Sequence, residues 1–131
     1  MGYDDSEAAE RALLRAADAA GDWDAVVIVT TTSRIASAGA APEPSLQPGA
    51  EPSALLAAAR ATVAAHASRA DVVLVAREGD PAEELLEVAR AASADLVIVG
   101  RRSEDVGART RLGSVATRVV EQAPCDVLVV A

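Results

Sequence analysis

Four short apolar runs constrain the fold of this chain more than any other feature of its sequence. Each run lies close behind an aspartate and is rich in valine, isoleucine and leucine; the four cover residues 25–30, 72–76, 96–100 and 127–131. None is long enough for a helix, and the apolar residues are continuous rather than alternating. Continuous hydrophobicity predicts strands that are buried on both faces, as in a parallel sheet between two layers of helices.

Helical patterns separate these runs. The clearest one places Leu85 and Val88 on one face. Asp80 and Pro81 stand just before it, in the positions of a capping residue and a first helical residue. Three further apolar stripes predict helices around residues 9–20, 56–67 and 112–123. Four helices that alternate with four strands predict an α/β fold: a single domain, residues 1–131, with a doubly wound parallel sheet and helices on both faces.

Residues 31–51 have a different composition. They contain three prolines and two glycines among alanine and serine. A stretch of this kind that leaves a strand predicts a flexible loop within the domain. Ligands of doubly wound sheets bind outside the carboxyl ends of the strands, so the loop is a candidate flap beside the site.

The composition excludes several functions. The chain has 12 basic and 20 acidic residues and a net charge of −8, which argues against binding to nucleic acid or to an anionic membrane. All the basic residues are arginine, which excludes a Walker P-loop and a Schiff-base enzyme. The single histidine, His66, and the single cysteine, Cys125, indicate no metal site. No leader and no membrane-spanning run are evident, so we expect a cytoplasmic protein.

The segment from Gly100 to Ser114 carries the strongest functional signal. It leaves the third apolar run, contains three glycines and leads directly into the last helix. Free N–H groups and the positive dipole end at a helix start attract anions, while Gly113 permits close approach and Ser114 offers a hydroxyl. Residues 101–118 also carry five arginines against two acidic residues. This pattern predicts a phosphate ligand; solvated arginines that bind nothing specific are the alternative.

The spacing of this segment resembles a known nucleotide-binding signature. Gly100, two residues, Ser103, nine residues, and then Gly113 and Ser114 are similar to the signature of the universal stress protein family, in which the second position is also glycine. Three other stretches look like that family, and they are Gly2-Tyr3-Asp4-Asp5-Ser6-Glu7, Glu78-Gly79-Asp80-Pro81 and Ala123-Pro124-Cys125-Asp126-Val127. The resemblance spans the whole chain except the start of the first strand.

The resemblance implies a five-stranded parallel sheet in the order 3-2-1-4-5, a dimer formed through the last strand, Val127 to Ala131, and a stress-response role without enzymatic turnover. It also implies an ATP site, in which the glycine loop holds the phosphates, Asp4 lies near the ribose or base, and Val29 lies near the adenine. By position, the site residues are Asp4, Val29, Gly100, Arg102, Ser103, Gly113, Ser114 and Val115.

The chain departs from the family pattern at two places. Ser103 replaces the second glycine, where it either strains the loop or adds a hydrogen bond to phosphate. Only Met1 stands where family members have several apolar residues. We expect Met1 to occupy a strand position and the reading frame to extend upstream, because an alanine-rich chain without lysine is typical of GC-rich genomes, in which a GTG valine codon can be read as a start. A chain that truly begins at Met1 lacks a central strand, which leaves two strand edges unpaired or forces them to pair directly.

Together these features predict an adenine-nucleotide-binding module, with ATP as its ligand, that acts as a stress-responsive regulator and is not an enzyme. The first alternative is a dimeric adaptor of the same fold that binds no nucleotide. The second is slow ATP hydrolysis with Asp4 or Glu104 as the base, although no pattern in the sequence selects either residue.

Overall fold

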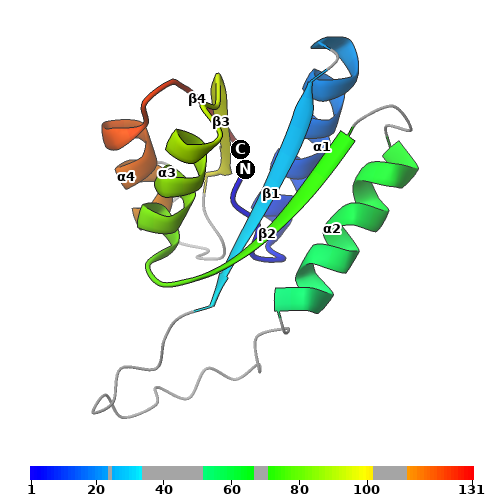
Figure 1. Ribbon diagram of the computed structural model, residues 1–131, viewed down its shortest axis with the longest axis horizontal. Helices are drawn as coiled ribbons and strands as arrows, with labels where there is room; N and C mark the ends of the chain where they lie inside the picture. Colours follow the sequence, from blue (N-terminus) through cyan, green and yellow to red (C-terminus); the bar gives the residue numbers. More distant parts are fainter. Residues whose placement is uncertain (24, 34–51, 67–70, 102–111) are drawn as a thin grey trace.

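The computed structural model describes residues 1–23, 25–33, 52–66, 71–101 and 112–131 (Figure 1). Helices and strands alternate along the chain, as the apolar runs predict. The elements are α1 (Glu7–Trp23), β1 (Val26–Ser33), α2 (Pro52–His66), β2 (Asp71–Glu78), α3 (Pro81–Ala91), β3 (Leu96–Gly100), α4 (Ser114–Gln122) and β4 (Asp126–Val130). The predicted α/β class, with parallel strands and helices on both faces, is confirmed.

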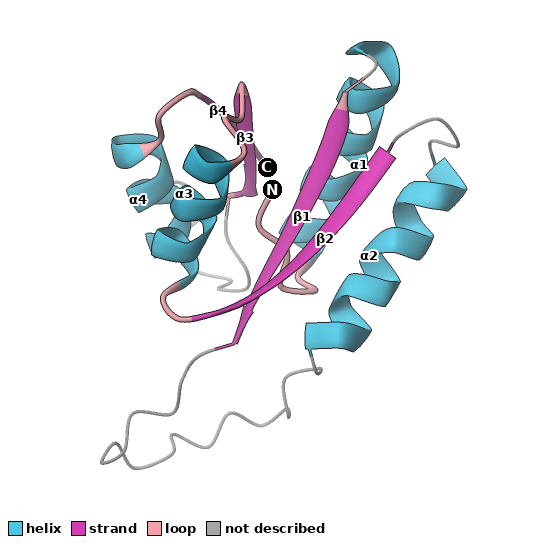
Figure 2. Ribbon diagram, in the orientation of Figure 1, coloured by secondary structure: helices cyan, strands magenta, loops and turns pink. Residues whose placement is uncertain are grey.

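The strands form two separate pairs instead of one continuous sheet. β1 pairs in parallel with β2, and β3 pairs in parallel with β4. Figure 2 shows these pairs apart, with the amino terminus between them. The expected five-stranded sheet is therefore interrupted at its centre. Within the described residues no ladder joins β1 to β3, so these two strands do not pair directly with each other.

Residues 1–3, here called the N-terminal segment, lie alongside β1 on the edge that does not pair with β2. The Met1 amine donates to the carbonyl of Ile28, the Thr30 N–H donates to Met1 at 2.8 Å, and the Tyr3 N–H donates to Thr30 at 2.9 Å. These bonds make a parallel bridge between Gly2 and Thr30. Met1 thus pairs with β1 as a strand residue would, as expected. On this side of the molecule the order is β2, β1 and then the N-terminal segment, which lies on the side of β1 that faces β3.

Each side of the strands has its own core. Helices α1 and α2 bury an alanine-rich cluster against β1, with Leu13 and Val29 fully buried in it. Helices α3 and α4 bury a second cluster against β3, centred on Val119. The many alanines of α1 have little side-chain volume, which lets this helix lie close to the strands.

The loop predicted for residues 31–51 begins later than expected. Residues 31–33 belong to β1, where they pair with residues 76–78 of β2. The three threonines at this end have high strand propensity, which accounts for the extension. Residues 34–51 lie outside the described part of the chain.

Candidate functional site

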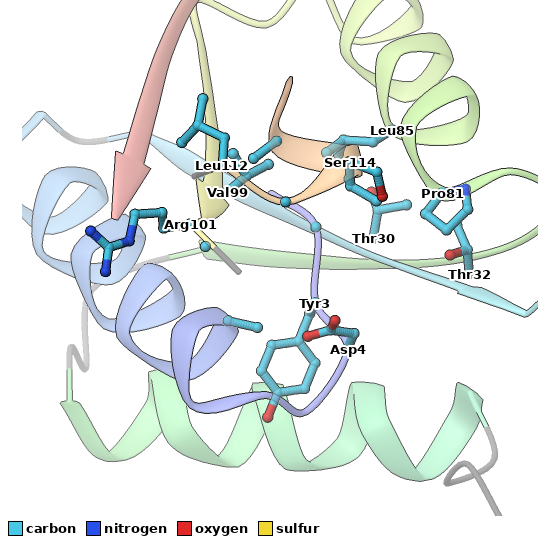
Figure 3. Close-up of a pocket in the computed structure, with 16 residues that line it drawn as sticks. Tyr3, Asp4, Thr30, Thr32, Pro81, Leu85, Val99, Arg101, Leu112 and Ser114 are labelled. Atoms are coloured by element: carbon cyan, nitrogen blue, oxygen red, sulfur yellow. The ribbon is translucent and has the colours of Figure 1, made fainter. Parts of the chain in front are cut away.

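A cavity of about 560 Å³ lies at the carboxyl ends of β1 and β3, beside the N-terminal segment (Figure 3). This is the edge at which doubly wound sheets bind ligands. Four parts of the chain contribute walls: the turn into α1, the end of β1, the start of α3, and the path from β3 into α4. The lining residues are Gly2, Tyr3, Asp4, Ala9, Thr30, Thr32, Pro81, Leu85, Val99, Gly100, Arg101, Leu112, Gly113, Ser114, Val115 and Ala116.

The amino terminus of α4 opens into this cavity. Gly113 is the N-cap residue and supplies no side chain, so no side-chain hydrogen bond caps the helix within the described residues. The Thr117 N–H donates to the Gly113 carbonyl at 2.9 Å, which starts the helical ladder. The N–H groups of Ser114, Val115 and Ala116 precede that bond and have no partner within the helix. Together with the helix dipole they form a site that attracts an anion.

The first and last glycines of the signature have different roles. A Cβ atom on Gly100 would lie 2.7 Å from the backbone C and O atoms of Ala8. Gly100 is therefore required for the close contact between β3 and α1, whatever it does for a ligand. Gly113 has φ −65° and ψ 161°, a conformation open to any residue, so its value to the site is the space left by the missing side chain.

The turn into α1 holds Asp4 at the edge of the cavity. Oδ1 of Asp4 accepts from the Ser6 hydroxyl at 2.6 Å and from the Ser6 N–H at 3.2 Å. Ser6 in turn caps α1, because its hydroxyl accepts from the Ala9 N–H at 3.2 Å. The cap is therefore Ser6, and Asp4 is an exposed carboxylate fixed by that cap.

The neighbouring Tyr3 and Asp5 stiffen this turn. Asp5 has φ 64°, a left-handed conformation that few residues other than glycine adopt readily. The Tyr3 hydroxyl donates to Oδ1 of Asp5 at 3.4 Å. Burial of the hydroxyl and the negative charges of Asp5 and Glu10 raise the pKa of Tyr3 to about 12, so Tyr3 stays a neutral hydrogen-bond donor near pH 7.

Two buried threonines lie at the end of β1. The hydroxyls of Thr30 and Thr31 are buried and have no hydrogen-bond partner among the described residues. Thr30 lines the cavity and Thr31 does not. In Figure 3 Thr30 lies below Ser114, which begins α4. A buried hydroxyl that lacks a partner costs about 1–3 kcal/mol, and a polar ligand in the cavity would give Thr30 a partner.

The arginines of the predicted positive cluster divide into two groups. Arg101 lines the cavity. Arg118 pairs with Asp80 at 2.9 Å and with Glu83 at 2.8 Å, and these contacts raise its pKa. Arg118 thus links α4 to the N-cap residue of α3. Its guanidinium is engaged with these two carboxylates and does not line the cavity. The other arginines of the cluster lie outside the described residues, and so do the predicted site residues Arg102 and Ser103.

The structure places most of the other predicted site residues together. Asp4, Gly100, Gly113, Ser114 and Val115 all line the cavity. Val29 does not: its side chain is fully buried in the core beneath α1 and α2.

Sequence reasoning missed Thr30 and Thr32, which line the cavity from the opposite face of β1. Their signal was visible, because these polar residues stand at the carboxyl end of an apolar run, the edge at which a ligand is expected.

Metal and thiol chemistry have little support in the described part of the chain. It contains no cluster of three or more histidine, cysteine, aspartate or glutamate side chains arranged for a metal ion. Burial, followed by the charges of Asp126 and Asp95, raises the pKa of Cys125, so the thiol stays protonated. Among the described helices, none combines the length and hydropathy that crossing a lipid bilayer requires.

A model of the universal stress protein family matches residues 1–131, the whole chain. The chain belongs to this family. A universal stress protein solved in complex with cAMP is 30% identical, with a TM-score of 0.77 over 99% of this chain and 92% of the other. A universal stress protein from Archaeoglobus fulgidus, solved in complex with dAMP, is 21% identical, with a TM-score of 0.68 over 99% of this chain and 94% of the other.

Curated universal stress proteins match shorter parts of the sequence. One from Methanocaldococcus jannaschii is 47% identical over 53 residues, which is 40% of this chain and 31% of that protein. One from Thermus aquaticus is 40% identical over 62 residues, which is 47% of this chain and 44% of that protein. The matched stretch thus spans less than half the length of either relative.

Proposed function

We propose that this universal stress protein binds an adenine nucleotide, with ATP as the ligand, in the cavity beside α4, and that it acts as a nucleotide-responsive regulator. The observation that carries the proposal is the amino terminus of α4, which presents N–H groups without a side-chain cap to a cavity of about 560 Å³. That volume lies within the range of about 300–1,000 Å³ usual for small-ligand sites. The 30% identical family member in complex with cAMP supports an adenylate ligand.

The lining residues suit the three parts of a nucleotide. The N–H groups at the start of α4, the Ser114 hydroxyl and the positive charge of Arg101 suit phosphate. The exposed carboxylate of Asp4 suits a ribose hydroxyl, which would donate to it. Val99 and Leu112 supply apolar surface for a base.

Binding without turnover is part of the proposal. Asp4 is the only carboxylate among the described lining residues, and Ser6 already donates two hydrogen bonds to its Oδ1. These two bonds hold the carboxylate in the turn at the start of α1. Release of phosphate above a protein-free control would contradict this part of the proposal.

Thermal unfolding with and without nucleotide tests the site. A ligand present at 100 times its Kd adds about 2.7 kcal/mol of stability, which is about 10 °C for a domain of 131 residues. We expect ATP to raise the midpoint of the natural chain. Gly113→Asp places a carboxylate on the free N–H groups, so the variant folds and loses the shift. The matched control is Gly113→Ala, which leaves the N–H groups free and keeps the shift.

A dimer through β4 completes the proposed regulator. Arg101 donates its N–H to the Val130 carbonyl at 2.7 Å, so alternate β4 residues face β3. The backbone groups of Val127 and Val129 then face the open edge, which invites pairing with a second copy. The competing adaptor function keeps this dimer and predicts no midpoint shift with ATP or cAMP.

A further inference from the structure

The outer edge of β2 is open within the described part of the chain. β2 pairs with β1 along its whole length, and no described strand pairs with its other side. Figure 2 shows this strand at the end of its pair, away from β3 and β4. An open strand edge presents a row of N–H and C=O groups that can pair with another chain. We call the open side of residues 71–77 the β2 edge.

The residues whose backbone groups point outward follow from the bonds that β1 makes. In a parallel ladder each residue directs its N–H and C=O to the same neighbour, and successive residues alternate. Ile28 and Thr30 bond to the N-terminal segment, so the odd-numbered residues of β1 bond to β2. Val29 lies opposite Leu74 and therefore bonds to the residues on either side of it. The even-numbered residues of β2 direct their backbone groups to the open edge, and they are Val72, Leu74 and Ala76.

The two faces of β2 differ in character. α2 covers the face of the even-numbered side chains, where Val72 and Leu74 pack against the core. The odd-numbered side chains point the other way. Val73 is 48% exposed among them, and the charged residues at the two ends are exposed as well. This face presents two valines between a negative and a positive charge, in the order Asp71, Val73, Val75 and Arg77.

This order is complementary to itself across a two-fold axis. When Leu74 lies opposite Leu74 of a second copy in an antiparallel pair, Asp71 lies opposite Arg77 at both ends. Val73 then lies opposite Val75 twice in the middle. Opposite charges and β-branched side chains both stabilise a sheet when they face each other across two strands. An axis at Val73 or Val75 would place neither charge opposite its counterpart.

The backbone hydrogen bonds agree with this register. In an antiparallel pair, residues whose groups point at each other exchange two bonds, and the residues between them have closer side chains. Leu74 points to the open edge and can exchange two bonds with its counterpart, and Val72 can do the same with Ala76. The valine pairs and the charge pairs then fall at the closer positions, about 4.5 Å between Cα atoms. Side-chain contacts across the strands are strongest there.

The position of α2 leaves room for a second copy. α2 contacts β1 and β2 alike, so its axis lies above the line between these strands. The two-fold axis of an antiparallel pair is perpendicular to the sheet, which puts the second α2 on the same face. The two helices are then two strand spacings apart, roughly 9.6 Å. Packed helices lie about 8–10 Å apart, so the two copies of α2 would touch without overlapping.

The flank of α2 that would face its counterpart has mostly small side chains. His66 contacts Asp18 of α1 at 2.8 Å, which marks the side of α2 toward α1. α1 packs against β3 and β4, so the opposite flank of α2 points toward the β2 edge. At about 100° per residue that flank consists of four exposed residues, Ser53, Ala57, Arg60 and Ala64. Three of them allow close approach, and the arginine is long enough to extend past the contact into solvent.

We propose that the β2 edge is an interface with a second copy of this chain, paired antiparallel about a two-fold axis at Leu74. The contact uses one strand and one helix flank from each copy, which is less than the surface of about 1,200 Å² usual for stable complexes. We therefore expect weak association, with a Kd of about 100 µM. At low micromolar concentrations only pairing through β4 would persist. At higher concentrations the β2 edge would join such dimers into larger assemblies.

Sedimentation velocity at about 10 µM and about 1 mM tests the proposal. The contact is mostly open at the lower concentration and mostly closed at the higher one, so the average mass should rise about 1.5-fold or more. Asp71→Arg sets like charges against each other at both ends, as does Arg77→Asp, and each should raise the Kd about tenfold. The double exchange returns opposite charges to both ends and should restore the rise. Asp22→Arg, at the exposed end of α1, changes the net charge equally and should leave the rise intact.

A mixture of the two single variants gives the sharpest result. The Asp71→Arg chain is positive at both ends of the β2 edge, and the Arg77→Asp chain is negative at both. The two should therefore associate with each other more strongly than either does with itself. A mixture that associates no better than its components, or a double exchange as weak as the single ones, would refute the register.

Amide hydrogen exchange separates this contact from pairing through β4. Exchange at the outward-facing amides of β2 should be slower at about 1 mM than at about 10 µM; these are the amides of Val72, Leu74 and Ala76. Slower exchange at Val127 and Val129 alone would assign the association to β4 and would overturn the proposal. A mass that does not rise with concentration would overturn it as well, while leaving nucleotide binding untouched.

Discussion

Replacing Gly100 by alanine separates the two roles that this residue can have. The signature places it beside a nucleotide, whereas the structure places its Cα against the backbone of α1. An added Cβ would lie 2.7 Å from the C and O atoms of Ala8 and 2.8 Å from its Cβ, well inside the 3.4–4 Å of ordinary contact. Backbone atoms cannot rotate away, so α1 and β3 must move apart.

The expected cost follows from this overlap. Overpacking a close contact by one methyl costs about 1–3 kcal/mol. For a domain of 131 residues that corresponds to a fall of about 4–10 °C in the thermal midpoint without any ligand. Gly21→Ala is the matched control, because nothing lies within 4 Å of a Cβ there and Gly21 is in α1. It should gain about 0.5–1 kcal/mol from helix propensity.

Circular dichroism at 222 nm during heating measures both variants, and urea titration at 25 °C gives their free energies of unfolding. A Gly100→Ala chain that is as stable as the natural one and has lost only its response to ATP would refute the packing role. Such a result would mean that Gly100 contributes to ligand binding and not to the packing of β3 against α1.

Three further predictions concern the termini and the end of β1. The Met1 amine has a pKa of 8.0 when exposed and about 6 when folded, so the unfolded chain binds more protons between these values. Stability should therefore rise by about 2 kcal/mol from pH 6 to pH 8, and acetylation of Met1 should flatten this rise in urea titrations. Thr31→Val should raise the free energy of unfolding by about 1 kcal/mol, because it removes a buried hydroxyl without a described partner; Thr30→Val should do the same and also reduce the midpoint shift with ATP. Val129→Pro removes an N–H from the open edge of β4 and should convert a dimer to a monomer in sedimentation velocity, with Val129→Thr as the control that keeps it.

The sequence was sufficient for the order of the helices and strands and for five of the residues that line the candidate site. Continuous apolar runs mark the four strands, although burial is less complete than expected: β1 and β3 contain buried residues, whereas β2 and β4, each paired with one strand only, contain none. Asp80 with Pro81 marks the start of α3, where Asp80 accepts from the N–H groups of Ala82 and Glu83. The uncapped start of α4 could also be expected, since glycine alone stands at its N-cap.

Other features could not be predicted, for physical reasons. A run that is apolar on both faces has no alternation, so nothing in it distinguishes the face of Val29 from that of Thr30. The contact of Gly100 with Ala8 depends on how closely two distant segments approach, and local sequence does not report that distance. The sequence left open whether β1 and β3 would pair directly, because that pairing depends on packing across the whole fold, which the individual runs do not encode.

Leu85 lines two cavities, and its Cδ2 lies 3.2 Å from where a Cβ of Gly2 would be. One isobutyl group is thus shared by the cavity at the carboxyl ends of β1 and β3 and by a second cavity, of about 480 Å³, that residues of both strands line. A ligand that changed the rotamer of Leu85 in one cavity would change the shape of the other. Any coupling of this kind is reciprocal: each ligand would change the affinity for the other by the same factor.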